Sequence, residues 1–179
     1  MREIEVKAKA KDFGALIDKL QSLGCKISDP INQKDYIYGK PGISLLEWAP
    51  GRILLRIRDQ DGKYIFTYKH SLNTELDKVE REVEVSDPKQ MEDIINFLDF
   101  QKIIEVHKIR RKVKYQDYEI CLDKVKGLGD FVEVEKMSVD GDGEKIQQEL
   151  WNFLKSLGVA EEDRVTVGYD RLIYAKQNS

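Results

Sequence analysis

Charged side chains recur at every second position in several short segments of this sequence, and the recurring charges of each segment have one sign. Glutamates alternate with other residues in EIEV, EREVEV and VEVE, whereas arginines and lysines do so in RIR and KIRRKVK. A period of two places such residues on one face of a β-strand. Clustered carboxylates suit a hard divalent cation, and clustered Arg and Lys suit phosphate oxygens. If these faces converge, they predict a site for a metal-bound polyphosphate.

Two arrangements of these strands are open. For any single strand, the simpler interpretation is an antiparallel sheet whose charged face is solvated. The whole set is harder to explain in that way, because a solvated face gains more from mixing the two signs within each strand. Like charges that oppose each other across a sheet also cost free energy, which a bound ligand can offset. We therefore favour a closed or nearly closed barrel whose charged inner face lines a wet cavity. The sequence has no P-loop motif, so the predicted site does not use a glycine-rich phosphate cradle.

Composition restricts the class of protein. The chain has 179 residues, a formal charge of −3 and 41% hydrophobic residues, which fits one domain with a real core rather than a disordered chain. The near-neutral charge argues against a nucleic-acid partner, and no apolar run is long enough for a membrane span. The N-terminus does not resemble a signal peptide, and Cys25 and Cys121 are far apart. We expect a cytoplasmic protein without a disulfide framework.

The elements that must position these residues can be outlined from periodicity. Helical spacing of apolar residues predicts helices over 12–23, 88–98 and 143–157, with Asp12 and Asp87 as caps and a short helical turn near Glu161–Arg164. Alternation predicts strands over eight segments: 2–9, 34–38, 52–58, 63–69, 79–85, 104–115, 118–125 and 131–138. Asp61-Gly62 and Gln116-Asp117 are expected to form tight hairpins. We expect an irregular excursion over 39–51, polar loops over 71–78 and 140–143, and a single domain over 1–179.

An ordered series of motifs resembles the CYTH superfamily, which is named for class IV adenylyl cyclases and thiamine triphosphatases. Glu3–Lys7 is similar to its ExExK signature, Arg56–Arg58 to its RxR strand, Glu82–Glu84 to its ExE strand and Lys108–Arg110 to its KxR strand. The series also includes Lys69, the acidic position Asp123, the GxGxFxExE-like segment Gly127–Glu135, and Gly168–Leu172, where Gly168 replaces the serine of the SYxxL stretch. The resemblance covers nearly the whole chain.

The resemblance implies an α+β fold, an eight-stranded antiparallel β-barrel or triphosphate tunnel with helices packed outside. It implies a Mg²⁺ (or Mn²⁺) cofactor and a small-molecule triphosphate as substrate. The implied metal ligands are Glu3, Glu5, Glu133 and Glu135, with Asp123 and Glu82 or Glu84 as further candidates. The residues implied to bind the substrate are Lys7, Arg56, Arg58, Lys69, Lys108, Arg110 and Tyr169, of which Lys7, Arg58, Lys108 and Arg110 are also expected to be catalytic. The alternative role for each basic residue is an ion pair with a neighbouring carboxylate.

The resemblance leaves the reaction open. A triphosphatase directs water at the terminal phosphorus, whereas a cyclase directs the ribose 3′-hydroxyl at the α-phosphorus, and both rely on charge neutralisation. Many class IV cyclases carry an HF-containing extension before ExExK, whereas this sequence starts directly before its motif, so we expect hydrolysis. A class IV adenylyl cyclase is the first alternative, and a non-catalytic polyphosphate- or nucleotide-binding protein the second. A homodimer is left open.

Three other residues have weaker claims to a function. His107 is out of phase with Lys108 and Arg110, which predicts a position on the outer face. Cys121 has the inner phase and is interpreted as a small filler. Trp48 is a candidate contact for the organic group of the substrate, with simple packing as its alternative.

Overall fold

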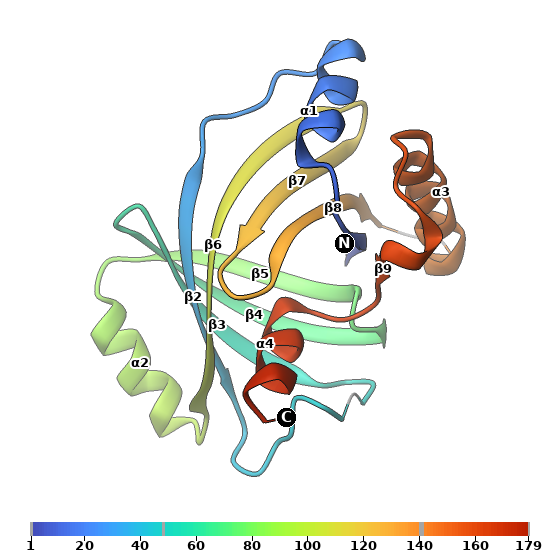
Figure 1. Ribbon diagram of the computed structural model, residues 1–179. Coiled ribbons are helices and arrows are strands. Elements are labelled where there is room, and N and C mark those ends of the chain that lie inside the picture. The colour runs from blue at the N-terminus through green and yellow to red at the C-terminus, as the bar shows by residue number, and fades with distance from the viewer. Residues whose placement is uncertain (1, 48, 140–141, 179) are drawn as a thin grey trace.

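One antiparallel sheet curls into a barrel in the computed structural model, which describes residues 2–47, 49–139 and 142–178 (Figure 1). Its strands are β1 (Arg2–Lys9), β2 (Ile31–Gly39), β3 (Ile53–Gln60), β4 (Lys63–Thr74), β5 (Asp77–Val85), β6 (Gln101–Tyr115), β7 (Tyr118–Val125), β8 (Gly129–Ser138) and the short β9 (Arg164–Val165). The strand order is β5-β4-β3-β2-β6-β7-β8-β1-β9, and β5 also pairs with β1. The predicted eight-stranded barrel in an α+β fold is confirmed.

The barrel closes through a short seam between β1 and β5. Glu3 pairs with Lys78 and Ile4 with Asp77, and β9 then pairs with β1 at Lys7 and Ala8. Beyond this seam, the described part of β5 pairs with β4 alone. The side chains at the seam are therefore brought together by closure of the whole barrel rather than by local sequence.

Four α-helices accompany the barrel: α1 (Phe13–Ser22), α2 (Pro88–Phe97), α3 (Gly143–Ser156) and α4 (Tyr169–Gln177). The first three match the predicted helices, and each begins where an aspartate accepts a hydrogen bond from a backbone N–H of the first turn: Asp12, Asp87 and Asp142. The expected turn near Glu161 is a 3₁₀-helix over Glu161–Asp163. Helix α4 was not predicted. No helix in the described ranges is long and apolar enough to cross a membrane.

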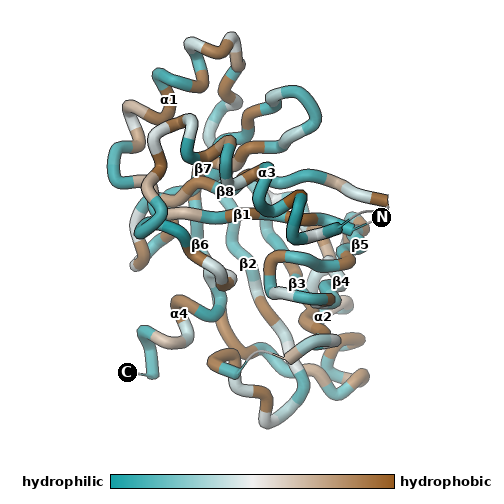
Figure 2. The backbone as a smooth tube through the Cα atoms, turned by 90° about the vertical axis from the view of Figure 1, so that its right-hand side faces the viewer, coloured by the Kyte–Doolittle hydropathy of each residue, from teal (hydrophilic) through white to brown (hydrophobic). Residues whose placement is uncertain are grey.

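Three helices cover the apolar outer face of the barrel. Leu16 and Leu20 of α1 and Trp151 and Leu154 of α3 pack against buried residues of β1, β7 and β8 such as Val6. Ile95 of α2 packs against a second cluster on β2 and β3. Figure 2 shows hydrophilic and hydrophobic residues alternating along the strands. Because the outer positions hold the apolar side chains, the inner positions are left for the charged ones.

Helix α4 packs against apolar side chains at one end of the barrel interior. Tyr169 joins Val106, Val125 and Phe131 in one cluster, and Ile173 also joins Ile37 in a neighbouring one. Val106, Val125, Phe131 and Ile37 have the inner phase of their strands, so this end of the interior is apolar. The charged inner positions lie deeper in the barrel and toward the seam end. Helix α4 therefore covers apolar side chains at this end of the barrel interior.

The connections between strands match the sequence predictions at two hairpins and differ from them over 71–78. The hairpins at Asp61-Gly62 and Gln116-Asp117 are confirmed, and Asp61 and Gln116 have positive φ angles of 49° and 55°. The expected polar loop over 71–78 is wrong, because β4 runs to Thr74 and β5 starts at Asp77. Polar side chains of that stretch have partners within the protein, such as Glu5 for Lys78 and Arg2 for Asp77, so their polarity does not mark a loop.

Candidate active site in the barrel

The barrel encloses a cavity of about 390 Å³ that is lined by side chains from all eight strands of the barrel and from the start of α4. Its lining includes every basic residue that the resemblance implies for substrate binding, together with Glu3, Glu5, Glu82, Glu133 and Glu135. A larger hollow of about 560 Å³ shares only Lys108 with this cavity and contains none of those glutamates. The predicted charged residues therefore share one enclosed space.

The centre of the cavity is a buried charge cluster on β6 and β7. Arg110 makes a two-pronged contact with Asp123, with Nε–Oδ1 and Nη2–Oδ2 distances of 2.7 and 2.6 Å. Lys108 Nζ lies 3.1 Å from Asp123 Oδ2. Asp123 is fully buried, which by itself raises its pKa, but Lys108 and Arg110 hold the pKa of Asp123 below the usual value. Asp123 thus aligns the two basic groups, and both of its oxygens contact them.

Lys7 links this centre to β1 and β8. Its Nζ lies 3.0 Å from Glu133 Oε1 and 3.4 Å from Glu5 Oε1. Arg110 also donates a hydrogen bond to Glu133. Burial raises the pKa of Glu133, but Lys7 and Arg110 outweigh it and hold that pKa well below the usual value. Glu133 is therefore ionised and doubly paired.

Two arginines of β3 form the opposite wall. Arg58 is held by Asp35 of β2 through Nε–Oδ1 and Nη2–Oδ2 contacts of 2.6 and 2.8 Å. Arg56 Nη2 donates to Thr67 Oγ1 at 2.9 Å and to Glu82 Oε1 at 2.7 Å. Both guanidinium groups are buried. Their carboxylate partners fix the orientation of planar donors that suit phosphate oxygens.

At the seam, Lys78 of β5 faces the glutamates of β1. Its Nζ donates a hydrogen bond to Glu5, lies 3.1 Å from Glu3 Oε1, and lies 3.6 Å from Glu80 Oε1. Lys69 contributes a further contact to Glu80, at 2.6 Å. Burial lowers the pKa of Lys78, but Glu5 and Glu3 outweigh it and raise that pKa well above the usual value.

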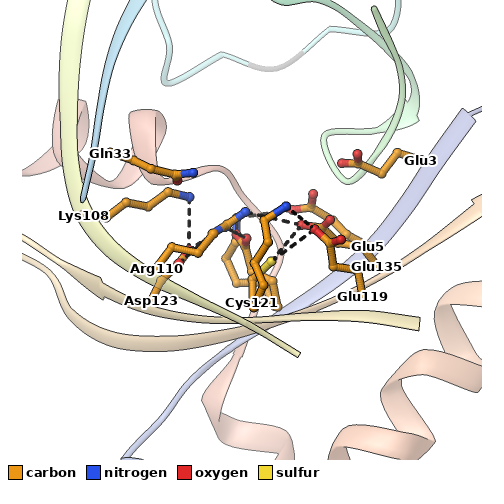
Figure 3. A network of polar contacts seen from close by, with 12 residues as sticks. Glu3, Glu5, Gln33, Lys108, Arg110, Glu119, Cys121, Asp123 and Glu135 are labelled. Atoms are coloured by element: carbon orange, nitrogen blue, oxygen red, sulfur yellow. Dashed lines mark hydrogen bonds and ion pairs between the residues drawn. The ribbon is translucent and has the colours of Figure 1, made fainter. Parts of the chain in front are cut away.

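Glu135 of β8 has weaker cation support than the other glutamates that line the described cavity. Arg110 Nη1 is 3.9 Å away, and the Cys121 thiol is 3.8 Å away. Burial, with a further contribution from the Glu3 carboxylate, raises the pKa of Glu135 well above the usual value. One oxygen from each of Glu3, Glu5 and Glu135 lies within 4.8 Å of the other two. Figure 3 shows Glu5, Glu119 and Glu135 gathered on one side of Arg110, away from Lys108 and Asp123.

This donor set fits a divalent ion. Carboxylate oxygens are the ligands that Mg²⁺ and Mn²⁺ favour, and the raised pKa of Glu135 indicates an unmet need for positive charge. Glu119, Cys121 and Glu135 form a second group within the same distance limit, although Glu119 already contacts Lys112 at 2.6 Å. Glu3, Glu5 and Glu135 thus form a carboxylate donor set that could hold such an ion.

Tyr169 lies at the apolar end of the cavity, at the start of α4. Its ring faces the ammonium groups of Lys7 and Lys108, whose Nζ atoms are 4.2 and 5.0 Å from the ring centroid. Its hydroxyl is buried without a hydrogen-bond partner among the described residues. A buried hydroxyl usually has a partner, so this one is suited to a ligand oxygen.

The other implied metal ligands are not part of the Glu3–Glu5–Glu135 group, although Glu133 shares the Lys7 ammonium with Glu5. Glu133 and Asp123 are paired with cations, and Glu82 holds Arg56. Glu84 is exposed opposite Ile65 and does not line the cavity, whereas Glu82, two residues earlier on β5, does. The alternative role of the basic residues was an ion pair with a neighbouring carboxylate. Each basic residue implied for substrate binding does contact at least one carboxylate.

Sequence reasoning missed several residues that complete the cavity. Asp35, Lys78 and Glu80 each contact a residue that was singled out. Asp35 and Glu80 have the inner phase of their strands, so alternation alone could have identified them. Lys78 lay in a segment interpreted as a loop. His107 faces away from the cavity with a partly exposed side chain, as its phase predicted, and Trp48 lies outside the described residues.

Comparisons with known proteins agree with this geometry. The family model for the CYTH domain matches residues 1–169. A relative named "Putative adenylate cyclase MJ0240", from Methanocaldococcus jannaschii, is 32% identical over 172 residues, covering 94% of this chain and 97% of the relative. The solved structure of PH1819 from Pyrococcus horikoshii is similar with a TM-score of 0.80 and 25% identity, covering 97% of this chain and 99% of that one. That of PH1012 from the same organism has a TM-score of 0.79 and 29% identity, covering 95% of this chain and 98% of that one. The protein belongs to the CYTH family.

Proposed function

We propose that this protein is a divalent-metal-dependent enzyme that hydrolyses a nucleoside triphosphate, an organic triphosphate or tripolyphosphate inside its charged barrel. The observation that carries the proposal is the division of the cavity into two parts. A group of three carboxylates, Glu3, Glu5 and Glu135, stands beside a wall of buried, oriented basic side chains, and Glu135 has Arg110 at 3.9 Å rather than a close ion pair. A metal-bound polyphosphate is complementary to both parts at once.

The basic residues would bind and align the phosphate chain. Arg56, Arg58 and Arg110 present planar donors whose orientation is set by Glu82, Asp35 and Asp123. Lys7 and Lys108 add point charges beside the ring of Tyr169, and Tyr169 adds a buried hydroxyl donor. Because these groups are held in place before the substrate arrives, they stabilise developing charge on the phosphoryl oxygens without having to reorganise.

Glu3, Glu5 and Glu135 would hold Mg²⁺ or Mn²⁺. When bound, such an ion supplies Lewis-acid polarisation of a phosphoryl oxygen. The unprotonated form of Glu135 is needed for binding, so the carboxylate must lose its proton as the ion enters.

Hydrolysis is proposed rather than cyclisation because it requires one positioned group fewer. The charged groups of the cavity lining suit phosphate oxygens and a metal ion, which both reactions need. Cyclisation also needs the ribose 3′-hydroxyl to be held against the α-phosphorus, whereas hydrolysis needs a water molecule. Class IV adenylyl cyclase activity remains the second candidate, and the name of the relative that is 32% identical favours it.

The deciding experiment is a product analysis. The purified protein is incubated with Mg²⁺ or Mn²⁺ and ATP, tripolyphosphate or thiamine triphosphate, and the products are separated. Metal-dependent release of orthophosphate is the expected result. Cyclic AMP with pyrophosphate would replace the proposal by the cyclase reaction. Metal-dependent binding without any product would indicate a non-catalytic polyphosphate-binding protein.

A Glu5→Gln variant provides the matched control for that assay. The amide keeps an oxygen that can accept from Lys78, so the variant should fold, but it weakens the metal site. Turnover that is unchanged in Glu5→Gln would show that Glu5 is not part of the metal site.

A further inference from the structure

The ammonium of Lys78 is surrounded by carboxylates in the way that a bound metal ion would be. Glu3 and Glu5 approach it from β1 and Glu80 from β5, and all three are within 4.0 Å of Nζ. The lysine side chain is 10% exposed and that of Glu5 is 6% exposed. Three carboxylates from two strands are a donor set that a hard divalent ion would also accept.

Glu3 and Glu5 also take part in a second group of carboxylates, with Glu135. The pair therefore has Lys78 on one side and the carboxylate of Glu135 on the other, and Glu5 also has Lys7 Nζ at 3.4 Å. An ammonium and a metal ion cannot occupy the same position, since both need the same oxygens. With Lys78 in place, the Glu80 side is filled and the Glu135 side is available.

We propose that the Lys78 ammonium takes the place of a second divalent ion, so that the barrel binds a single divalent ion, on the Glu135 side of the Glu3–Glu5 pair. This inference rests on the proposed function, because it concerns the ion that the proposed reaction needs. Lys78 is then a positioning residue. Its ammonium holds the carboxylates of Glu3 and Glu5 in place on the side away from Glu135. The ion then binds on the Glu135 side, where Arg110 also lies.

The test counts bound Mn²⁺ without using turnover. Mn²⁺ is titrated into the full-length protein and the free ion is followed by electron paramagnetic resonance. The wild-type protein should bind one ion per chain. Lys78→Ala leaves Glu3, Glu5 and Glu80 without the shared ammonium and should bind two. Lys69→Ala is the matched control and should bind one, because Lys69 contacts a single carboxylate, that of Glu80, in the described part of the chain.

Removal of Lys78 also leaves buried carboxylates uncompensated, so the variant is prepared with Mn²⁺ present and its fold is checked by circular dichroism. Lys78→Gln, which keeps a hydrogen-bond donor of similar length, is measured beside it and should also bind two ions. Two ions in the wild-type protein would overturn the inference and leave the proposed function standing. A folded Lys78 variant that still binds one ion would also overturn it. No bound Mn²⁺ in the wild-type protein would overturn both.

Discussion

Glu135 provides the sharpest test of the metal site, because its effect on stability should change sign when metal is added. Its carboxylate is buried, has Arg110 only at 3.9 Å, and shares its surroundings with Glu3 and Glu5. Without metal, these conditions disfavour the charged form of Glu135. Glu135→Gln removes that charge and keeps the shape, so the variant should be more stable than the wild type in a chelator.

The size of this effect follows from the geometry. At 4.8 Å, two like charges repel by about 3 kcal/mol at an effective dielectric of about 20 and by about 1 kcal/mol in water. Lys78 offsets part of the charge on Glu3 and Glu5, so we count the repulsion between Glu135 and one other carboxylate charge. Glu135→Gln should then raise the free energy of unfolding by about 1–3 kcal/mol.

The pH dependence has a defined sign. The pKa of Glu135 is raised in the folded protein, so between the usual glutamate pKa of about 4.3 and the raised value the folded state binds more protons than the unfolded state. The wild type therefore loses stability as pH rises through that window, and Glu135→Gln lacks this loss. The stability difference between the two proteins should be larger at about pH 8 than at about pH 5.

The assay is urea unfolding followed by circular dichroism, with and without Mn²⁺. At a free Mn²⁺ concentration of about 100 times Kd, binding adds about 2.7 kcal/mol to the free energy of unfolding of the wild type. The advantage of Glu135→Gln over the wild type should then disappear or reverse. Glu119→Gln is the control, because Glu119 already has Lys112 as a partner and its loss should bring no gain in stability. A Glu135→Gln variant that is less stable than the wild type in chelator at about pH 8 would refute the reasoning.

Three further predictions concern the other charged groups. Glu5→Gln should lower metal-dependent kcat at least about 100-fold with an unchanged circular dichroism spectrum, and full activity would remove Glu5 from the metal site. Arg56→Ala should raise KM for tripolyphosphate by about tenfold or more and that for pyrophosphate by less, since it removes a charge-assisted donor; an unchanged KM would leave Arg56 with an ion-pair role alone. Asp35→Ala should lower the free energy of unfolding by about 3–5 kcal/mol near neutral pH, because Arg58 loses its carboxylate partner. The pKa of Asp35 is depressed because Arg58 and Arg56 outweigh burial, so this contribution should be present above about pH 4 and be lost in acid; urea midpoints that do not differ between Asp35→Ala and the wild type near neutral pH would contradict it.

Much of the fold could be predicted because its signals are local. Alternation in Glu3–Lys7 gives both the strand and its inner face, and the aspartate caps mark where α1 and α2 begin. The same alternation placed Arg56 and Arg58 on one face, which is the face that the cavity uses. These features depend on neighbours within a few residues of each other.

What could not be predicted depends on closure of the barrel. Lys78 faces Glu3 because the strands are staggered by a fixed register around the barrel, and nothing near Lys78 in the sequence specifies that register. Helix α4 could not be predicted for the same reason, because Tyr169 and Ile173 pack against inner residues of strands that are distant in the sequence. The pairing of Asp123 with both Lys108 and Arg110, which separates it from Glu135, likewise appears only in three dimensions.

The most direct test of the central claim is anomalous diffraction from a crystal of the protein soaked with Mn²⁺ and tripolyphosphate. The account predicts a manganese peak among the carboxylates of Glu3, Glu5 and Glu135. It also predicts phosphate density against Arg56, Arg58 and Arg110. Manganese and phosphate bound on the outer face of the barrel, with the cavity empty of both, would contradict it.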